Sequence, residues 1–234
     1  METIDTLALM LGAGWAAGIN LYAAILVLGY MGMTGHVTLP PGLEVLSDPM
    51  VMGIAGIMYC VEFFADKTPG VDSGWDTLHT FIRIPAGALL AAGAASGFEV
   101  DQAAELVAAL VGGTLAAGSH FTKTGSRLMI NTSPEPVSNW TASIVEDLAV
   151  IGGLWTALNY PTAFILLLVL FVALVIWLLP KIWRALKRLF HRLGRFFSGG
   201  GEGSAASSHS PEERAETLKS LFRDNGETAD TLKK

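Results

Sequence analysis

The sequence is poor in charged residues. Only 15% of its 234 residues are Asp, Glu, Lys or Arg, against roughly 25% in a typical soluble domain. Hydrophobic residues make up 51% of the chain, and its mean hydropathy is +0.48. Long stretches of Ala, Leu, Val, Ile and Gly hold almost no charge. These properties exclude an ordinary soluble globular domain and indicate an integral membrane protein.

Cysteine and the familiar catalytic motifs are also scarce. Cys60 is the only cysteine, which excludes disulfides within the chain and multi-Cys metal sites. The sequence contains no HExxH, P-loop, GxSxG or Cys/His zinc spacing. We therefore expect no cofactor and no metal. The opening METIDT has no basic n-region and no small-residue cleavage site, so the first apolar stretch is expected to be a retained helix.

Long apolar runs are what the chain does contain. A helix that crosses the ~30 Å hydrocarbon core needs roughly 20 mostly apolar residues. Five stretches meet or approach this length, and a sixth is apolar except for Glu146 and Asp147. The expected spans are Leu7–Met33, Pro49–Ala65, Phe81–Phe98, Ala103–Ser119, Asn139–Leu158 and Pro161–Leu179. We predict an all-α, polytopic transmembrane bundle of six spans. A five-span alternative makes Asn139–Leu158 re-entrant or interfacial.

The placement of Lys and Arg predicts the orientation. With six spans, both termini lie on one side, and residues 34–48, 97–102 and 159–160 form the loops on the other. Those loops contain no Lys or Arg, so all 15 such residues fall on the side of the termini or in helix ends facing it. The positive-inside bias then places both termini in the cytoplasm. The expected location is the inner (cytoplasmic) membrane of a bacterium.

The domain organisation follows from the charge pattern. Residues 1–180 form the transmembrane domain. Residues 181–197 have apolar positions at helical spacing among basic ones, which suits a helix lying on an anionic inner leaflet or a basic stop-transfer flank. Residues 198–234 begin Gly- and Ser-rich and are expected to form a mostly disordered cytoplasmic tail.

Two short sequence echoes indicate an internal repeat. LGAGWAAG at Leu11–Gly18 and VGGTLAAG at Val111–Gly118 share four residues at an offset of 100, and VEFFA at Val61–Ala65 resembles VEDLA at Val145–Ala149. They predict two three-helix halves, about 1–98 and 103–180. An odd number of spans in each half makes the repeats inverted, a plan that recurs in secondary transporters. Alternatively, the small residues only let the helices pack closely.

A first group of polar residues leads into the third expected span. Asp72, Asp76, His79 and Arg83 are separated by four, three and four residues, which places them within ~60° of one helical face. Pro85 follows directly, and it either kinks the helix or delays its start. In the latter case the four residues line a cytoplasmic loop.

A second group follows the fourth expected span. His120, Lys123, Arg127 and Asn131 are separated by three, four and four residues and share one face within roughly 80° if the helix continues. The following INTSPEPVSNW contains two prolines and cannot be ordinary helix throughout. We predict a broken or re-entrant element somewhere in residues 121–139, tolerated at membrane depth only under cover of protein or water.

Ionisable residues inside a membrane are costly. A charge at mid-bilayer costs on the order of 3 kcal/mol, so such residues usually face the bundle interior or a water-filled cavity. Charge at cytoplasmic helix ends is the alternative interpretation. The candidate substrate-binding residues are His79, Arg83, His120, Lys123, Arg127, Asn131 and Asn20. The candidate ion-coupling residues are Glu62, Asp66, Asp72, Asp76, Glu135, Glu146 and Asp147.

These residues favour a small membrane transporter or flippase-like carrier. The cationic side chains would attract an anionic solute or lipid head group, and the acids would bind a coupling proton or cation. One alternative is a membrane-embedded enzyme that acts on lipid phosphates through Asp76 and His79. Another is a channel or scaffold subunit with a structural polar core. The expected partners are an anionic bilayer, the anionic ligand and a second copy of the chain, with no nucleic acid.

Three segments carry a resemblance to a known family. They are VEFFADKTPGVDSGWDTLHTFIRIPAGALLA at Val61–Ala91, HFTKTGSRLMINTSPEPVSNW at His120–Trp140, and GAGWAAGINLYAA near the start. Over roughly residues 5–180 the chain resembles a bacterial family of integral membrane proteins described as domain of unknown function 4126. The resemblance implies a membrane location. It implies no activity and no catalytic residues.

Overall fold

The described residues of this computed structural model are 3–68, 70–97, 102–131 and 136–198, together with positions 215, 216 and 219. They divide into two units, Met1–Leu186 and Lys187–Lys234. In the second unit, positions 187–198, 215, 216 and 219 are helical. Most of the predicted tail, 198–234, lies outside the described residues. The fold and the site below belong to the first unit.

All regular structure among the described residues is helical, which confirms the all-α prediction. One short 3₁₀ helix, η1, accompanies six α-helices. Their bounds are α1 (Thr3–Met33), η1 (Pro41–Ser47), α2 (Pro49–Ala65), α3 (Val71–Ala95), α4 (Gln102–Ile130), α5 (Pro136–Asn159) and α6 (Pro161–Ser198).

Five of these helices are long and apolar enough to cross a membrane, as expected for a multi-pass membrane protein. Helix α2 is long and apolar enough to cross a membrane only when it is counted together with η1, and the axes of these two helices differ by 68°. The five-span alternative therefore pointed to the wrong segment. Helix α5, which contains Asn139–Leu158, is long and apolar enough to cross a membrane by itself. Helix α2 has only 17 residues.

Local sequence signals explain several helix ends. Asp48 caps α2, because its Oδ1 accepts hydrogen bonds from the backbone N–H groups of Met50 and Val51 at 2.8 and 3.3 Å. Proline occupies the first position of α2, α5 and α6, where the missing N–H removes no helical hydrogen bond. Gly35, with φ of +73°, follows the end of α1, a conformation that favours glycine.

Helices α3 and α4 extend beyond their predicted spans into the predicted polar stripes. α3 begins at Val71 instead of Phe81, and α4 ends at Ile130 instead of Ser119. Pro85 lies inside α3 and does not end it. Both extensions carry polar stripes, which a search for apolar runs does not include. Residues 121–130 and 136–139 are regular helix, and residues 132–135 lie outside the described residues.

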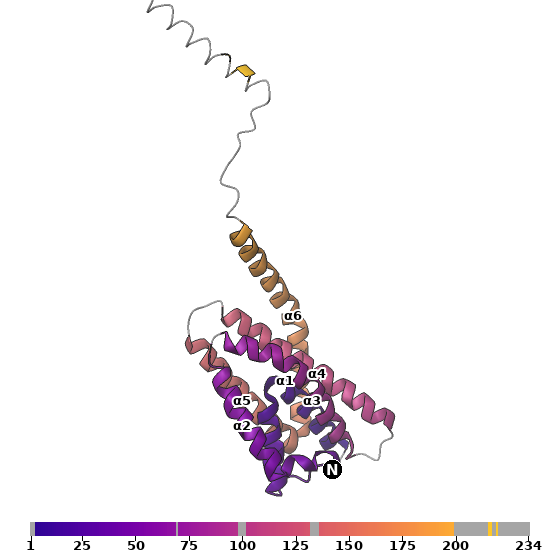
Figure 1. Ribbon diagram of the computed structural model, residues 1–234. Coiled ribbons are helices and arrows are strands. Elements are labelled where there is room, and N and C mark those ends of the chain that lie inside the picture. Colours follow the sequence, from indigo (N-terminus) through magenta and orange to yellow (C-terminus); the bar gives the residue numbers. More distant parts are fainter. Residues whose placement is uncertain are drawn as a thin grey trace, which may run out of the picture. The chain divides into compact units, whose positions relative to one another are not determined.

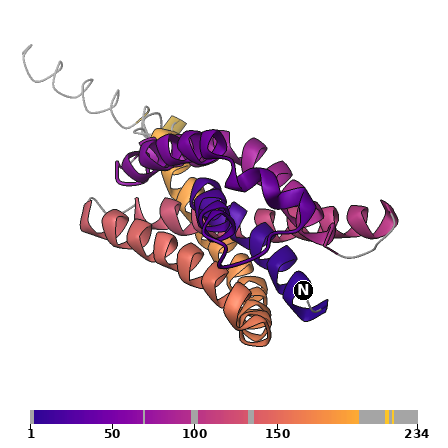
Figure 2. The same ribbon diagram turned by 90° about the horizontal axis from the view of Figure 1, so that it is seen from below.

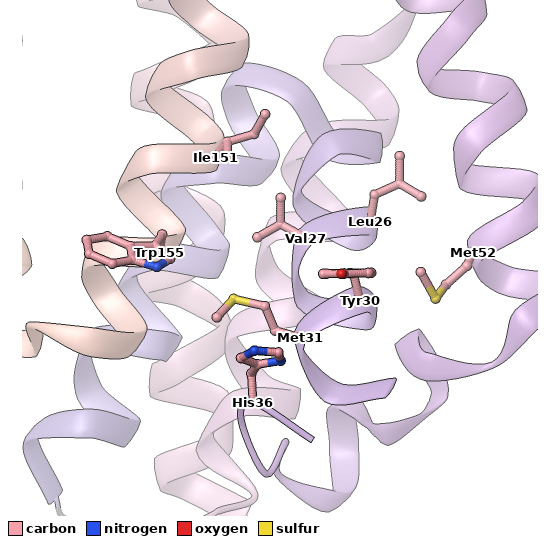
Figure 3. Close-up of a pocket in the computed structure, with 8 residues that line it drawn as sticks. All are labelled: Leu26, Val27, Tyr30, Met31, His36, Met52, Ile151 and Trp155. Atoms are coloured by element: carbon pink, nitrogen blue, oxygen red, sulfur yellow. The ribbon is translucent and has the colours of Figure 1, made fainter. Parts of the chain in front are cut away.

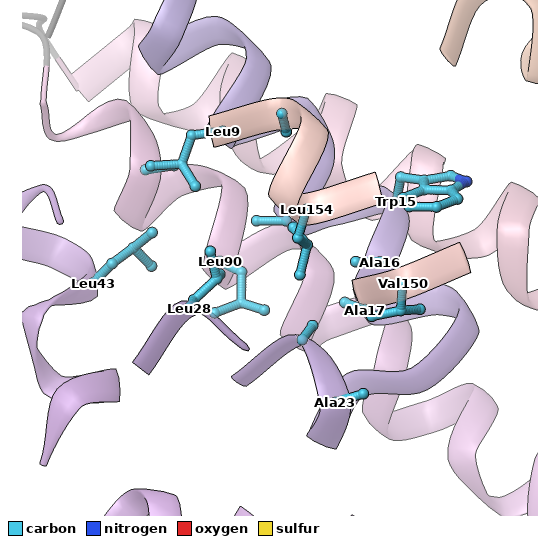
Figure 4. Close-up of a cluster of buried hydrophobic side chains, with 14 of the residues drawn as sticks. Leu9, Trp15, Ala16, Ala17, Ala23, Leu28, Leu43, Leu90, Val150 and Leu154 are labelled. Carbon is cyan, nitrogen blue, oxygen red and sulfur yellow. The ribbon is translucent and has the colours of Figure 1, made fainter. Parts of the chain in front are cut away.

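Helix α1 is the centre of the unit. It packs against α2, α3, α4 and α5, while α3 and α4 form the most extensive helix pair. Figures 1 and 2 show α1 enclosed by the other helices. Its Leu9 and Leu28 are fully buried and belong to one apolar core with Leu154 of α5 (Figure 4). Trp15 makes edge-to-face contacts with Phe164 and Phe171 of α6, at centroid distances of 6.0 and 5.9 Å.

Glycines allow α1 to approach its neighbours closely. A Cβ added to Gly14 would lie 2.7 Å from the Cα of Gly112, and one added to Gly18 would collide with Ala116 and Ser119 of α4. Both contacts join the two predicted halves. Gly12 faces Ala157 and Phe164, and Gly112 faces Gly87 and Ala91. These contacts also join the two predicted halves. A Cβ added to Gly118 would meet nothing within 4 Å, so this glycine of the predicted repeat makes no such close approach.

The most consequential local feature is a break in α1. Asn20 has φ of −147° and ψ of 99°, so the helix is interrupted there. The Asn20 Oδ1 accepts a hydrogen bond from the N–H of Ala23 at 3.0 Å and thereby caps the second half of the helix. A broken helix is tolerated at membrane depth where protein covers the freed backbone groups. Sequence analysis identified Asn20 as a polar residue but predicted an unbroken span.

Candidate functional site

Lys123 of α4 lies at the centre of a buried cluster of charged side chains. Its ammonium donates hydrogen bonds to the Asp66 Oδ2 at 2.7 Å, the Ile19 carbonyl at 3.2 Å and the Glu62 Oε1 at 3.4 Å. The Ile19 carbonyl directly precedes the break at Asn20 and therefore belongs to the freed end of the first half-helix. The Lys123 Nζ also lies 3.8 Å from the Asp76 Oδ1 and 3.6 Å from the Glu146 Oε2.

Arg83, in the middle of α3, joins this cluster from the other side. Its Nη2 donates to the Glu62 Oε1 at 2.7 Å, and its Nη1 donates to the Asp76 Oδ1 at 3.1 Å. The same Nη1 lies 3.2 Å from the His120 Nδ1. Because a guanidinium can only donate, the His120 Nδ1 accepts. The Nε2–H of His120 then donates to the Thr80 Oγ1 at 2.8 Å.

Arg127 connects α4 to α5 and to the end of α2. It binds Glu146 through two parallel hydrogen bonds, Nε to Oε1 at 3.1 Å and Nη2 to Oε2 at 2.6 Å. Such bidentate pairs are among the strongest polar contacts in proteins. The Arg127 Nη1 donates to the carbonyls of Asp66 and Asn139 at 2.7 and 3.3 Å. Every cationic group in the cluster is thus held by carboxylates.

We call these seven charged side chains the ion-pair network. Its members are Glu62, Asp66, Asp76, Arg83, Lys123, Arg127 and Glu146. The Glu146 side chain is 15% exposed, and no other member exceeds 4%. Four carboxylates face three cations, which leaves a surplus of one acid.

Several carboxylate oxygens in the network have no donor. Among the described residues, nothing donates a hydrogen bond to the Glu62 Oε2, the Asp66 Oδ1 or the Asp76 Oδ2, and all three atoms are buried. Buried acceptors are normally satisfied, and each unpaired one costs about 1–3 kcal/mol. The network therefore has both the charge and the free acceptor atoms to take up a proton.

Asp147, the residue after Glu146, lies in a different environment. Its Oδ1 accepts from the Asn20 Nδ2 at 2.9 Å, and its Oδ2 accepts from the Tyr59 hydroxyl at 3.0 Å. We call Asn20, Tyr59 and Asp147 the Asp147 triad. Tyr59 was missed by sequence analysis, although its spacing offered a signal: it precedes Glu62 by three residues and Asp66 by seven, on the same face of α2.

Asp72 and Asn131 form a separate contact near the ends of α3 and α4. The Asn131 Nδ2 donates to the Asp72 Oδ2 at 2.8 Å, while the backbone N–H groups of Gly70 and Ser73 donate to the Asp72 Oδ1. Asn139, also missed by sequence analysis, donates to the Asn131 Oδ1 at 2.7 Å. Asp72 thus stabilises the start of α3, and the structure brings neither Asp72 nor Asn131 into the ion-pair network.

His79 has its own partners. Its Nδ1 donates to the Trp75 carbonyl at 2.9 Å, its Nε2 accepts from the Tyr22 hydroxyl at 3.2 Å, and its ring stacks on Trp75. The first predicted stripe therefore divides, with Asp76 and Arg83 in the network and Asp72 and His79 outside it. Glu135, the remaining candidate, lies outside the described residues.

The burial of the cations changes the orientation argument. Lys67 donates to the Phe63 carbonyl and to the Ser143 Oγ at 3.2 and 3.1 Å. Burial lowers the pKa of this ammonium, against the opposing effect of Asp147 and Asp66. Lys67, Arg83, Lys123 and Arg127 are all buried and cannot serve as a charged surface for lipid head groups. The positive-inside argument therefore rests on the residues from Lys181 onward.

An apolar pocket of about 580 Å³ lies between α1, α2 and α5 (Figure 3). Each helix that lines it carries one member of the Asp147 triad on the same face. Asn20 precedes the lining residue Val27 by seven residues, Tyr59 follows Met52 by seven, and Asp147 precedes Ile151 by four. The complete lining is Leu26, Val27, Tyr30, Met31, His36, Met52, Ile151 and Trp155.

The family model described as "Domain of unknown function (DUF4126)" matches residues 7–181, a range that begins within α1 and ends within α6. No curated protein and no solved structure matches the chain.

Proposed function

The chain belongs to the family described as Domain of unknown function (DUF4126), and we propose that it is a small membrane carrier that moves a proton together with an anionic solute or lipid head group. The observation that carries this proposal is the surplus of one carboxylate in the buried ion-pair network. Charge buried in a low-dielectric interior is costly, so the network's net charge limits what it can bind.

The charge count favours coupled binding. With four acids and three bases ionised, the network carries one net negative charge. A monovalent anion alone would double that charge, whereas a proton alone would cancel it. An anion that arrives with a proton leaves the net charge unchanged. Joint uptake therefore avoids the cost of isolated buried charge, which is the physical basis of the proposed coupling.

The proposal assigns proton binding and anion binding to different residues of the network. Protonation of Glu62 or Asp76, both of which bind Arg83 through one oxygen, weakens that ion pair. The freed guanidinium of Arg83, with Lys123 and Arg127, then binds the anion. Of the other candidates, His120 lies beside this centre, because its Nδ1 accepts from Arg83. His79 and Asn20 are hydrogen-bonded to other groups.

The predicted topology belongs to the same proposal. Six spans, with η1 and α2 together forming the second, give two inverted three-helix halves and two cytoplasmic termini in an inner membrane. The break in α1 supports this plan, because inverted-repeat transporters place their sites at broken helices near the midplane.

The basic segment would bind an anionic leaflet. The exposed apolar face of α6, which includes Leu166 and Leu170, would meet lipid or a second copy.

A structural polar core is the second candidate. It is favoured by the observation that each network cation is already paired with a carboxylate. In that case the network would only hold α2, α3, α4 and α5 together. The enzyme alternative has less support, because Asp76 and His79 contact different partners and the arginine beside Asp76 is occupied.

Purified protein in liposomes separates these candidates. A pH-sensitive dye inside the vesicles would report proton movement when inorganic phosphate or a short-chain phosphatidate is added outside. The carrier predicts anion-dependent proton influx that is lost in Glu62→Gln and kept in the control Asp72→Asn, which lies outside the network. Folded protein that moves neither protons nor these anions would support the structural role instead.

A further inference from the structure

We propose that Asp147 is a second protonatable site, which exchanges protons through the apolar pocket and signals its state to the ion-pair network through the break in α1. This proposal rests on the proposed proton coupling and names its route. It assigns a role to the pocket and to Tyr59.

Asp147 is buried and forms no direct ion pair among the described residues, although Lys67 and Lys123 act on it electrostatically. It is 8% exposed, and each of its oxygens accepts one hydrogen bond from a neutral group, the Asn20 amide or the Tyr59 hydroxyl. Each carboxylate oxygen can accept two hydrogen bonds, so both retain a free lone pair. The preceding Glu146 instead has two hydrogen bonds from Arg127. A proton on Asp147 therefore removes a buried charge without breaking an ion pair.

The donor set suits a proton and does not suit a metal cation. Hard cations such as Ca²⁺ and Mg²⁺ take six or more oxygen ligands. Asp147 and Tyr59 together offer three oxygens, and Asn20 turns its amide nitrogen toward the carboxylate. The Asn20 Oδ1 is occupied by the N–H of Ala23. A proton needs only one of the free lone pairs of Asp147.

The pocket supplies the path. Its volume of about 580 Å³ exceeds by more than tenfold the ~30 Å³ that one water occupies in the liquid. Figure 3 shows Tyr30, His36 and Trp155 among its lining side chains, and these provide polar atoms for water. The triad lies one to two helical turns further along the same helix faces. Asp147 is thus the first buried carboxylate along α5 from the pocket.

Asn20 connects Asp147 to the network. Its amide nitrogen donates to Asp147, and its Oδ1 caps the second half of α1. The carbonyl of the preceding residue, Ile19, accepts from Lys123. A protonated carboxyl is a weaker acceptor than a carboxylate, so protonation loosens the Asn20 contact and changes the position of the break. The charged and titratable neighbours of Asp147 are Tyr59, Glu62, Lys67, Lys123 and Glu146.

Infrared difference spectroscopy of the protein in detergent tests this directly. A step from alkaline to acidic pH should produce a carboxylic-acid C=O band from Asp147. Asp147→Asn should lose that band, and Tyr59→Phe, which removes one hydrogen bond to it, should shift it. Asp72→Asn, with the same chemical change outside the triad, should keep it. An unchanged spectrum in Asp147→Asn would overturn the proposal.

A pocket-filling variant tests the route. Val27→Trp places a large side chain in the pocket, and rapid mixing should show the Asp147 band rising at least about tenfold more slowly, equal to about 1.4 kcal/mol of added barrier. Val107→Trp, at an exposed position of α4, is the matched control. Equal rates in the two variants would exclude the pocket as the route. An Asp147 band in protein that transports no anion would contradict the proposed function and leave the proton site intact.

Discussion

Buried charge is stabilised in different ways on the two sides of helix α1. Toward α3 and α4, the carbonyl of Ile19 contacts a network of both signs, and Gly14 and Gly18 allow close backbone packing. Toward α2 and α5, one carboxylate is held by two neutral donors beside a pocket. On the first side, a change of charge weakens an ion pair. On the second side, neutral hydrogen bonds let a carboxylate change its charge without breaking one.

The difference has a thermodynamic consequence. Removing one partner of a buried ion pair typically costs about 3–5 kcal/mol, because an uncompensated charge remains. Removing one neutral donor from a carboxylate costs less, about 1.5–3 kcal/mol. Substitutions on the two sides of α1 should therefore differ in how much they lower the free energy of unfolding.

The largest effect is expected on the network side. Arg83→Met leaves Glu62 and Asp76 without their guanidinium and should lower the free energy of unfolding by about 3–5 kcal/mol. Denaturant unfolding in detergent measures this loss. Arg184→Met, at an exposed position, is the control. Adding Glu62→Gln to Arg83→Met should recover part of the loss. A loss below about 1 kcal/mol would mean that the network is solvated.

Packing between α1 and α4 gives an effect comparable to that of a broken ion pair at the partly exposed Glu146. A Cβ at Gly18 collides with backbone atoms of Ala116, whereas one at Gly118 meets nothing within 4 Å. Gly18→Ala should destabilise the protein by about 1–3 kcal/mol through overpacking. Gly118→Ala should be neutral or stabilising by up to about 1 kcal/mol, because alanine favours helix. The same unfolding assay compares them, and equal effects would contradict the close approach of the two helices.

The adjacent acids of α5 give a direct comparison of the two sides. Glu146→Gln removes the charge that Arg127 binds twice and should cost about 2–3 kcal/mol of stability. Asp147→Asn keeps an acceptor for one donor and should cost about 1 kcal/mol or less. Thermal unfolding of the two variants in one detergent checks the order. A reversed order would remove the distinction between the two sides.

The smallest effect is expected at the triad. Tyr59→Phe removes one hydrogen bond to the Asp147 carboxylate and should lower the free energy of unfolding by about 1.5 kcal/mol. Tyr160→Phe, at an exposed position between α5 and α6, should change it by less than half of that amount. A larger loss than in Glu146→Gln would show that the triad, and not the network, dominates stability.

The sequence predicted the helices well where an apolar run and a proline coincide. The bounds of α2 agree with the prediction, because Asp48 and Pro49 mark its start. The predicted start of α3 was ten residues late, since a search for apolar runs leaves out the polar turns that hold Asp72, Asp76 and His79. Helical spacing placed these polar residues on one face correctly.

Spacing could not predict depth or partners. Asp72 and His79 share a face with Arg83 but bind other groups, because only tertiary packing decides which turn meets α2 and α4. The break at Asn20 was also missed, since one polar residue in an apolar run leaves the hydropathy high. Tyr59 was missed because a tyrosine in a membrane helix is common, and its role appears only when Asp147 lies opposite.

The stoichiometry of transport tests the central claim most directly. In liposomes, opposing gradients of pH and of a monovalent anion can be varied until net anion flux stops. The surplus of one carboxylate in the network predicts that flux stops where the two gradients balance at one proton per anion. Anion flux whose reversal point does not depend on pH would contradict the account.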